Sequence, residues 1–410
     1  MKACVADTRC RPSFYYISYA IVLSIMRPRI ILFVANFFFS IFSTLLIYLL
    51  LPYLSTLIPE TSTGIVIALG GLAALLVFPF LPRLVARYGA QQLALVFAIA
   101  EMIALFALAT APGVAVVGIL CIALTIALEP FIAYELDLLL EATGAEEGSA
   151  GRVRSLFLTA WNIGVFTAPL IIGALLDNTN AYGRGFFAAA IVLIPFVILF
   201  AVRNLPKGAS PKTAHLRDTL VCISHDRDLS AVTACHQILW FFYVWAPFYV
   251  PVYLHTELGM PWSSLGWMFS VMLIPYVLLE YPAGWVADRF IGDKEMMFVG
   301  FLIAGGALAA ISLVTASTPV FIILIILLAS RAGAALIEST TEGHFFRRVS
   351  AQDINSMSIF RASWPLAYVI APIIASIILF FGGYHTLFLL TGGLIALVGA
   401  GTTLLIKDFR

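Results

Sequence analysis

The sequence contains few charged residues. They make up 11% of its 410 residues, whereas hydrophobic residues make up 62%. Ordinary soluble domains contain about 25% charged residues, so this composition excludes a soluble globular protein. The net charge of +1 offers no basic surface for a nucleic acid. The shortage of charge therefore predicts a chain that crosses a membrane many times.

Cysteine and histidine are also scarce, with five and six residues. The cysteines form no CxxC pair and no Cys/His ligand spacing, so we expect no disulfide framework, no metal site and no cofactor. The sequence contains no G-x-x-x-x-G-K-[ST], H-E-x-x-H or G-x-S-x-G pattern. These absences argue against ATP hydrolysis by this chain and against a membrane enzyme.

Apolar runs of about 20 residues, the length that a helix needs to cross a bilayer, occur twelve times. The predicted spans are 29–57, 62–82, 91–111, 113–138, 154–176, 184–203, 230–254, 262–287, 296–315, 319–343, 354–379 and 383–406. The longest polar connection, 204–229, contains Pro, Gly and Ser and is interpreted as a cytoplasmic linker. It separates an N-terminal six-helix half, 29–203, from a C-terminal six-helix half, 230–406.

Lysine and arginine fall almost entirely on the side of the two termini, and the opposite loops contain only Arg184. Because loops rich in these residues stay in the cytoplasm, both termini of this multi-pass protein of a plasma or inner membrane are predicted to be cytoplasmic. Residues 1–28 are interpreted as an N-terminal tail and 407–410 as a C-terminal tail. The alternatives for 1–28 are a signal peptide, for which no A-x-A-like cleavage site is present, and an extension upstream of a start at Met26.

The fifth and eleventh spans are related in sequence. Ser155, Phe157, Trp161, Ala168, Pro169 and Ile171 recur as Ser358, Phe360, Trp364, Ala371, Pro372 and Ile374 at a constant offset of 203 residues. Glu135 and Glu338 are related by the same offset. One helix used twice in the same direction predicts an all-α fold of two six-helix bundles in parallel pseudo-twofold repeat. This arrangement is expected for transporters that rock one half against the other around a midplane site.

The stretch YPAGWVADRFIGDKE resembles a loop motif of the major facilitator superfamily, G-x-x-x-D-R-x-G. Gly284, Asp288 and Arg289 match the motif, and Gly292 stands one residue late. The corresponding first-half stretch keeps Arg87 but has proline and alanine in place of the glycine and the acid. We therefore expect any acid-dependent function of this motif to lie mainly in the second half.

The fifth span carries a second pattern of the same superfamily, with Gly164, Pro169 and Gly173. The resemblance covers residues 29–406 and implies a monomeric secondary transporter that moves a small organic solute by alternating access, coupled to protons. The fifth-span pattern is associated with exporters, so the narrower prediction is an antiporter for efflux of lipophilic or cationic compounds. The alternatives are a sugar, amino-acid or organic-anion permease, and a transporter-like sensor that moves no solute.

The charges around the loop motif suggest a gate at the cytoplasmic face. Glu280, Gly284 and Asp288 lie on one stripe of a helix, and Arg289 is within reach of the acids that end the tenth span. The predicted gate residues are Glu280, Gly284, Asp288, Arg289, Glu338 and Glu342, with Arg87 and Glu135 as first-half members. The alternative is that Arg289 only fixes the topology of the loop.

Ionisable residues within spans are expected to be functional, and the resemblance implies that the first, fourth, seventh and tenth spans line a central cavity. Glu129 and Arg331 lie at similar depth in the fourth and tenth spans. They would bind a charged solute, or pair until protonation separates them; a purely structural ion pair is the alternative. The predicted substrate or coupling residues are Glu129, Arg331, His236, Trp240, Asn36, Asn162 and Arg361.

Three prolines within spans, Pro130, Pro169 and Pro372, are predicted to bend their helices because proline removes a backbone hydrogen bond. Trp161 and Trp364 are interpreted as packing residues related by the repeat. His236 and Trp240 lie on one aromatic face of the seventh span, which would suit a flat solute or a cation; ordinary packing and an interfacial aromatic belt are the alternative.

Overall fold

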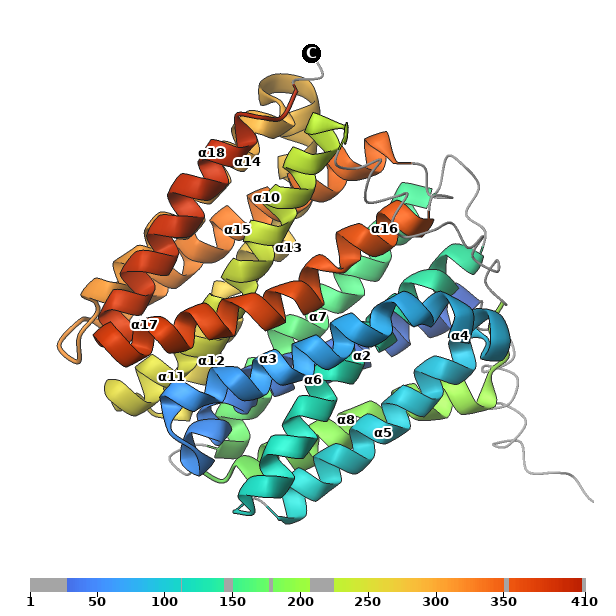
Figure 1. Cartoon of the computed structure of the whole chain (residues 1–410), viewed down its shortest axis with the longest axis horizontal. Helices are drawn as coiled ribbons and strands as arrows, with labels where there is room; N and C mark the ends of the chain where they lie inside the picture. The colour runs from blue at the N-terminus through green and yellow to red at the C-terminus, as the bar shows by residue number, and fades with distance from the viewer. Residues whose placement is uncertain are drawn as a thin grey trace, which may run out of the picture.

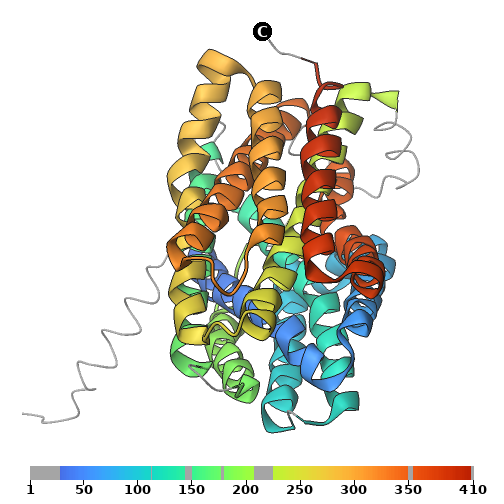
Figure 2. The same cartoon turned by 90° about the vertical axis from the view of Figure 1, so that its left-hand side faces the viewer.

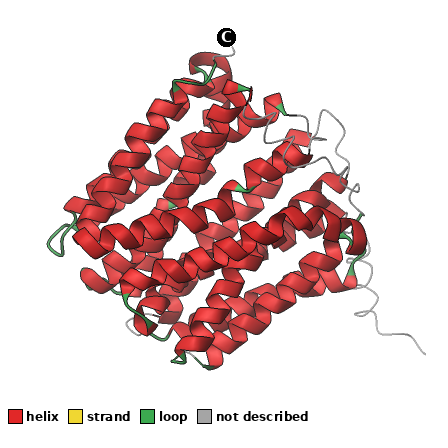
Figure 3. Ribbon diagram, viewed as in Figure 1, coloured by secondary structure: helices red, strands yellow, loops and turns green. Residues whose placement is uncertain are grey.

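A computed structural model of the chain describes residues 28–111, 113–143, 150–176, 180–206, 225–349 and 354–407. The described residues form helices and short connections, without a β-strand among them (Figure 3). Residues 1–27 of the predicted tail, 207–224 of the predicted linker and 408–410 lie outside the described residues.

The N-terminal half contains the elements that correspond to the first six predicted spans. They are α2 (Pro28–Leu57), α3 (Glu60–Val77), η1 (Phe78–Phe80), α4 (Leu81–Tyr88), α5 (Ala90–Thr110), α6 (Ala115–Ala142), α7 (Ala150–Leu176) and α8 (Tyr182–Val202). α3, η1 and α4 follow one another directly and together form the second span, Glu60–Tyr88.

The C-terminal half repeats this plan with more interruptions. Its elements are α10 (Arg227–Val244), η2 (Trp245–Tyr249), α11 (Val250–Val252), η3 (Tyr253–Glu257), α12 (Trp262–Met272), α13 (Ile274–Val286), η4 (Ala287–Ile291), α14 (Asp293–Ala310), η5 (Ile311–Leu313), α15 (Val320–Arg348), α16 (Ile354–Arg361), α17 (Ser363–Leu394), η6 (Ile395–Gly399) and α18 (Ala400–Thr403).

Eleven helical runs within the described ranges are long and apolar enough to cross a membrane. The last run, Ile359–Thr403, covers most of both the eleventh and the twelfth predicted spans, 354–379 and 383–406. Gly383 separates them, because its φ of 67° is not helical and turns the chain back. The predicted all-α polytopic fold is therefore confirmed.

The two halves lie side by side, with N-terminal helices coloured blue to green and C-terminal helices yellow to red (Figures 1 and 2). Because the chain crosses an even number of times, Pro28 and Lys407 lie at the same end of the bundle. We call this end the terminal face and the other end the opposite face. The lysine and arginine pattern predicts that the terminal face is cytoplasmic.

Two repeat-related contacts join the halves toward the opposite face. A Cβ on Gly266 of α12 would lie 2.7 Å from the Pro169 carbonyl oxygen of α7, and a Cβ on Gly64 of α3 would lie 2.5 Å from the Pro372 carbonyl oxygen of α17. Real Cβ atoms do not approach this closely, so glycine is required at both places. The halves are thus tightly packed at this face. Pro169 and Pro372, which the repeat relates to each other, make the two equivalent contacts.

The late glycine of the loop motif has a structural explanation. Gly89 and Gly292 both have positive φ, 86° and 104°, and each precedes the next membrane helix. The Gly89 N–H donates to the Val85 carbonyl four residues back, whereas the Gly292 N–H donates to the Ala287 carbonyl five residues back. The π-helical turn η4 therefore accommodates one extra residue in the second half.

Candidate functional site

A cavity of about 250 Å³ lies between the halves. Its wall comes from α2, α6, α10 and α15, the four helices predicted to line it, and also from η1, η2, α7, α13, α16 and α17. Most of the wall is apolar or aromatic, and its charged residues are Asp137, Arg331, Glu338, Glu342 and Arg361. Within the described ranges, no group of three or more histidine, cysteine or acidic side chains is arranged to hold a metal ion.

The cavity wall contains two cations among the described residues, and Arg331, unlike Arg361, has no carboxylate partner there. Arg331 is 3% exposed. Its guanidinium carbon lies 5.2 Å from the centre of the Phe242 ring, and Tyr48 lies beside the guanidinium. Among the residues that the structure describes, it forms no ion pair, and its Nε has no hydrogen-bond partner. An unpaired buried cation is unfavourable, so this position favours an anion in the cavity.

Glu129 does not pair with Arg331 in the described part of the chain. It is 1% exposed and lies behind the wall, where its Oε1 accepts a hydrogen bond from the Ser43 hydroxyl. Ser43 itself lines the cavity. Glu129 and Arg331 thus do not contact each other: Arg331 lines the cavity, whereas Glu129 contacts the wall residue Ser43.

The aromatic part of the wall contains both tryptophans that the repeat suggested were packing residues. Trp161 and Trp364 line the cavity, and Trp364 stacks on Trp240 with ring centres 4.9 Å apart. His236 lies outside the wall; its Nε2 accepts a hydrogen bond of 3.0 Å from the Trp240 indole N–H, and its ring stacks on Phe360 at 3.7 Å. His236 therefore orients Trp240 from behind.

The two predicted asparagines and Pro130 also line the cavity. The Asn36 side-chain amide donates a hydrogen bond of 2.9 Å to the Phe157 carbonyl, which joins α2 to α7. Pro130, Pro169 and Pro372 all lie inside helices, as predicted. Their bending of those helices stays a prediction.

The terminal end of the cavity contains a connection between the halves. Arg361 forms ion pairs with Asp137 of α6 at 3.4 Å and with Glu342 of α15 at 2.9 Å. All three side chains are partly exposed. Deeper in the cavity, the Tyr243 hydroxyl donates a hydrogen bond of 2.5 Å to Glu338. Glu342 and Glu338 were the predicted partners of Arg289 in the gate. In the structure Glu342 pairs with Arg361, and Glu338 accepts a hydrogen bond from Tyr243.

Of the four gate residues around the loop motif, the structure describes Gly284 and Arg289. The side chains of Glu280 and Asp288 lie outside the described residues, so the latch stays a prediction. A Cβ on Gly284 would lie 3.5 Å from the Ser339 hydroxyl oxygen, which places this glycine against α15. Arg289 is exposed.

The first-half members of the gate do not meet in the part of the chain that the structure describes. Arg87 is exposed, with its guanidinium carbon 5.2 Å from the centre of the Tyr88 ring. Glu135 is fully buried, and neither of its carboxylate oxygens has a hydrogen-bond partner.

Sequence reasoning missed Tyr48, Tyr276 and Tyr368, three tyrosines of the wall. One of them had a detectable signal. Asn36, Ser40, Thr44 and Tyr48 recur at every fourth position of the first span, so a polar stripe on one helix face leads to Tyr48.

Comparisons with known proteins agree with this architecture. Residues 229–408 match the family model described as Major Facilitator Superfamily. A curated relative from Cupriavidus necator, named "Probable sulfoacetate transporter", is 27% identical over 156 residues. That match covers 38% of this chain and 35% of the relative, so the chain matches about a third of the relative's length.

Solved structures of low sequence identity share the fold. A point mutant of the nucleoside transporter NupG superposes with a TM-score of 0.75 at 14% identity, covering 93% of this chain and all of that one. A POT family transporter in complex with a thioalcohol-conjugated peptide superposes with a TM-score of 0.73 at 12% identity, covering 90% and 94%. At these identities the likeness establishes the fold alone.

Proposed function

We propose that the chain is a transporter of the major facilitator superfamily and that the solute it moves across the membrane is a small organic anion held by Arg331. The observation that carries the proposal is the buried guanidinium of Arg331, which faces the cavity without a carboxylate partner among the described residues. A guanidinium binds carboxylate or sulfonate oxygens through several N–H donors at once. The similarity to a sulfoacetate transporter supports the same class of solute.

The shape of the cavity supports an anion of small size. Its volume of about 250 Å³ and its aromatic wall leave room for a short apolar part next to the charged group. Efflux of a lipophilic cation, the narrower prediction from the sequence, is the second candidate. The stacked Trp240 and Trp364 rings and the Glu338 carboxylate favour it through cation–π and charge attraction.

Uptake into liposomes that contain the purified full chain tests the proposal. The panel consists of sulfoacetate, other short sulfonates and carboxylates, a neutral nucleoside and a lipophilic quaternary cation, each measured under imposed pH gradients of both signs. We expect movement of the short anions, and the gradient that drives it assigns import or efflux. Movement of the cation without any anion would overturn the proposal, and no movement of any solute would favour a sensor.

Proton coupling through Glu129 is part of the same proposal. Glu129 is buried and accepts a hydrogen bond from Ser43, which lines the cavity. Glu101 of α5 is also fully buried, and neither of its carboxylate oxygens has a hydrogen-bond partner. Phe97, four residues before Glu101, contacts Phe131, two residues after Glu129, with ring centres 5.5 Å apart, so α5 packs against α6 near these acids. Neither carboxyl group forms an ion pair among the described residues, and this is the environment of a proton carrier within a membrane.

Glu129→Gln is expected to abolish accumulation driven by a pH gradient while retaining exchange of solute across the membrane, because glutamine mimics a permanently protonated acid. The comparison of gradient-driven uptake with counterflow of sulfoacetate measures this separation. Glu141→Gln is the control and should keep gradient-driven accumulation, since Glu141 is on the same helix but is exposed and outside the cavity wall. Normal gradient-driven accumulation by Glu129→Gln would exclude the coupling role.

A further inference from the structure

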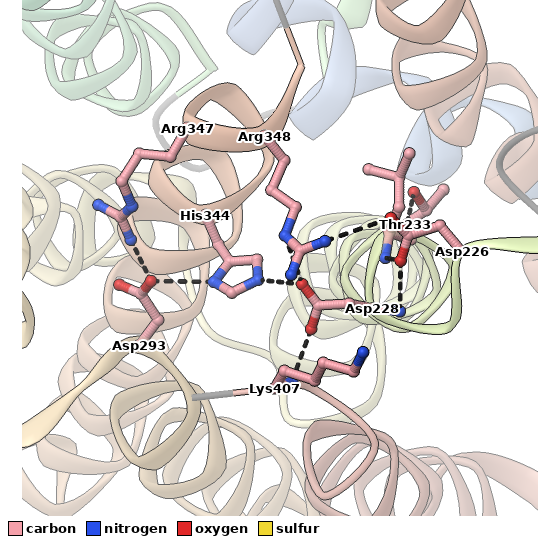
Figure 4. Close-up of polar contacts among 9 residues, drawn as sticks. Asp226, Asp228, Thr233, Asp293, His344, Arg347, Arg348 and Lys407 are labelled. Carbon is pink, nitrogen blue, oxygen red and sulfur yellow. Dashed lines mark hydrogen bonds and ion pairs between the residues drawn. The ribbon is translucent and has the colours of Figure 1, made fainter. Parts of the chain in front are cut away.

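A second group of charges lies at the terminal face of the C-terminal half, away from the cavity wall (Figure 4). Its centre is His344, near the end of α15. The His344 Nε2 lies 2.9 Å from Asp228 Oδ2, and its Nδ1 lies 3.0 Å from Asp293 Oδ2. Asp228 belongs to the first turn of α10 and Asp293 to the first turn of α14. One imidazole therefore joins the ends of three helices.

The carboxylates around His344 have further partners. Asp228 is fully buried, forms an ion pair of 2.8 Å with Arg348 Nε, and accepts a 2.6 Å hydrogen bond from the backbone N–H of Lys407. Arg347 pairs with Asp293, and Arg348 also pairs with Asp226 at 3.2 Å. The cluster thus also ties down the segment that follows the last helix.

The geometry requires a charged imidazole. Each ring nitrogen faces a carboxylate oxygen, which only accepts hydrogen bonds, so both nitrogens must carry a proton. Asp226, which caps α10, completes the balance. Burial opposes its ionised form, but the backbone N–H groups of Leu229 and Asp228, together with Arg348, hold the pKa of Asp226 below its ordinary value. Asp226, Asp228 and Asp293 then face the cations Arg347, Arg348 and protonated His344, and the charge of Lys407 also acts on Asp226.

We propose that the His344 cluster is a proton-dependent clamp that fixes α10, α14, α15 and the C-terminal segment at the terminal face. Loss of the proton places a bare ring nitrogen against a carboxylate oxygen and removes the positive charge that lies between Asp228 and Asp293. The clamp then opens at the ends of α10 and α15, the helices that carry Trp240 and Arg331 into the cavity.

The sign of the pH dependence follows from the charged form. An isolated histidine loses its proton near pH 6.5, and flanking carboxylates favour the protonated state. The stabilisation is therefore complete at acidic pH and is lost as the pH rises above neutrality. Because the terminal face is predicted to be cytoplasmic, the clamp would report the pH of the cytoplasm.

The test uses the full-length chain in detergent micelles and needs no solute, so its result is independent of the proposed transport function. The unfolding temperature of the wild type is expected to fall by several degrees between about pH 6 and 9, and His344→Asn is expected to lack this pH-dependent fall. At about pH 6, His344→Asn should speed hydrogen exchange of the C-terminal peptide about fivefold, because the bond from the Lys407 N–H to Asp228 is weakened.

The control is His385→Asn, since His385 bonds to the Ser312 carbonyl and lies outside the cluster. It should keep the wild-type pH profile. If His344→Asn fails to fold, Asp293→Asn removes one carboxylate and should flatten the profile in part. A wild-type pH profile in His344→Asn or in Asp293→Asn, or an equal loss in His385→Asn, would overturn the clamp.

Discussion

Arg331→Gln is expected to weaken binding of sulfoacetate about 100-fold, equivalent to about 3 kcal/mol. The guanidinium is 3% exposed and has no carboxylate partner among the described residues, so an anion in the cavity would supply its charge partner. Hydrogen bonds to charged groups contribute about 1.5–3 kcal/mol each, and a bidentate contact uses two of them. Titration calorimetry of the purified protein with sulfoacetate measures the change.

Two further variants make this prediction specific. Arg331→Lys keeps the charge but loses the planar fork of donors, so its affinity should fall between the wild type and Arg331→Gln. Arg184→Gln removes an exposed arginine near the start of α8, at the opposite face, and should bind as the wild type does. Equal affinity of the wild type and Arg331→Gln would show that Arg331 does not hold the solute.

The fold could be predicted from the sequence because its main determinants are local. A bilayer requires about 20 apolar residues per helix, so hydropathy alone places the spans. The offset of 203 residues between the halves is visible in the sequence, and the structure confirms it at Pro169 and Pro372, which make equivalent contacts. The boundary between the last two spans depended on one residue, Gly383, whose positive φ breaks the helical run.

The site could be predicted only in part, because depth in the membrane is readable from sequence and rotation about a helix axis is not. Glu129 and Arg331 were placed at similar depth, yet Glu129 turns to Ser43 and Arg331 turns to the cavity. Helix rotation is set by packing against neighbours, and apolar spans show little periodicity to reveal it. The same limit explains why Trp161 and Trp364 were interpreted as packing residues although both line the cavity.

The His344 cluster illustrates a second limit. Its members come from the starts of α10 and α14, the end of α15 and the segment after α18, so each pair is far apart in sequence. Charged residues at helix ends are common and are interpreted first as topology signals. Only the packed arrangement of the helices shows that His344 has a carboxylate on each side.

Gly266→Ala is expected to shift the protein toward a state that is open at the opposite face. In the structure, a Cβ at this position would lie 2.7 Å from the Gly173 Cα as well as from the Pro169 carbonyl oxygen. Both contacts are with the backbone of α7, which leaves little room for adjustment, and overpacking of this kind costs about 1–3 kcal/mol. If the halves rock apart to relieve it, the equilibrium moves by about 5- to 150-fold.

Cysteine labelling measures this shift. Ala133→Cys places a thiol in the cavity wall, and in a background without the native cysteines a membrane-impermeant maleimide added at the opposite face reaches it only when that face opens. Gly266→Ala should raise the labelling rate. Gly306→Ala is the matched control, because a Cβ on this glycine of α14 meets nothing within 4 Å. Equal labelling in the two variants would mean that the close approach of α7 and α12 does not govern opening, and Gly64→Ala, at the repeat-related contact, would then also be expected to have no effect.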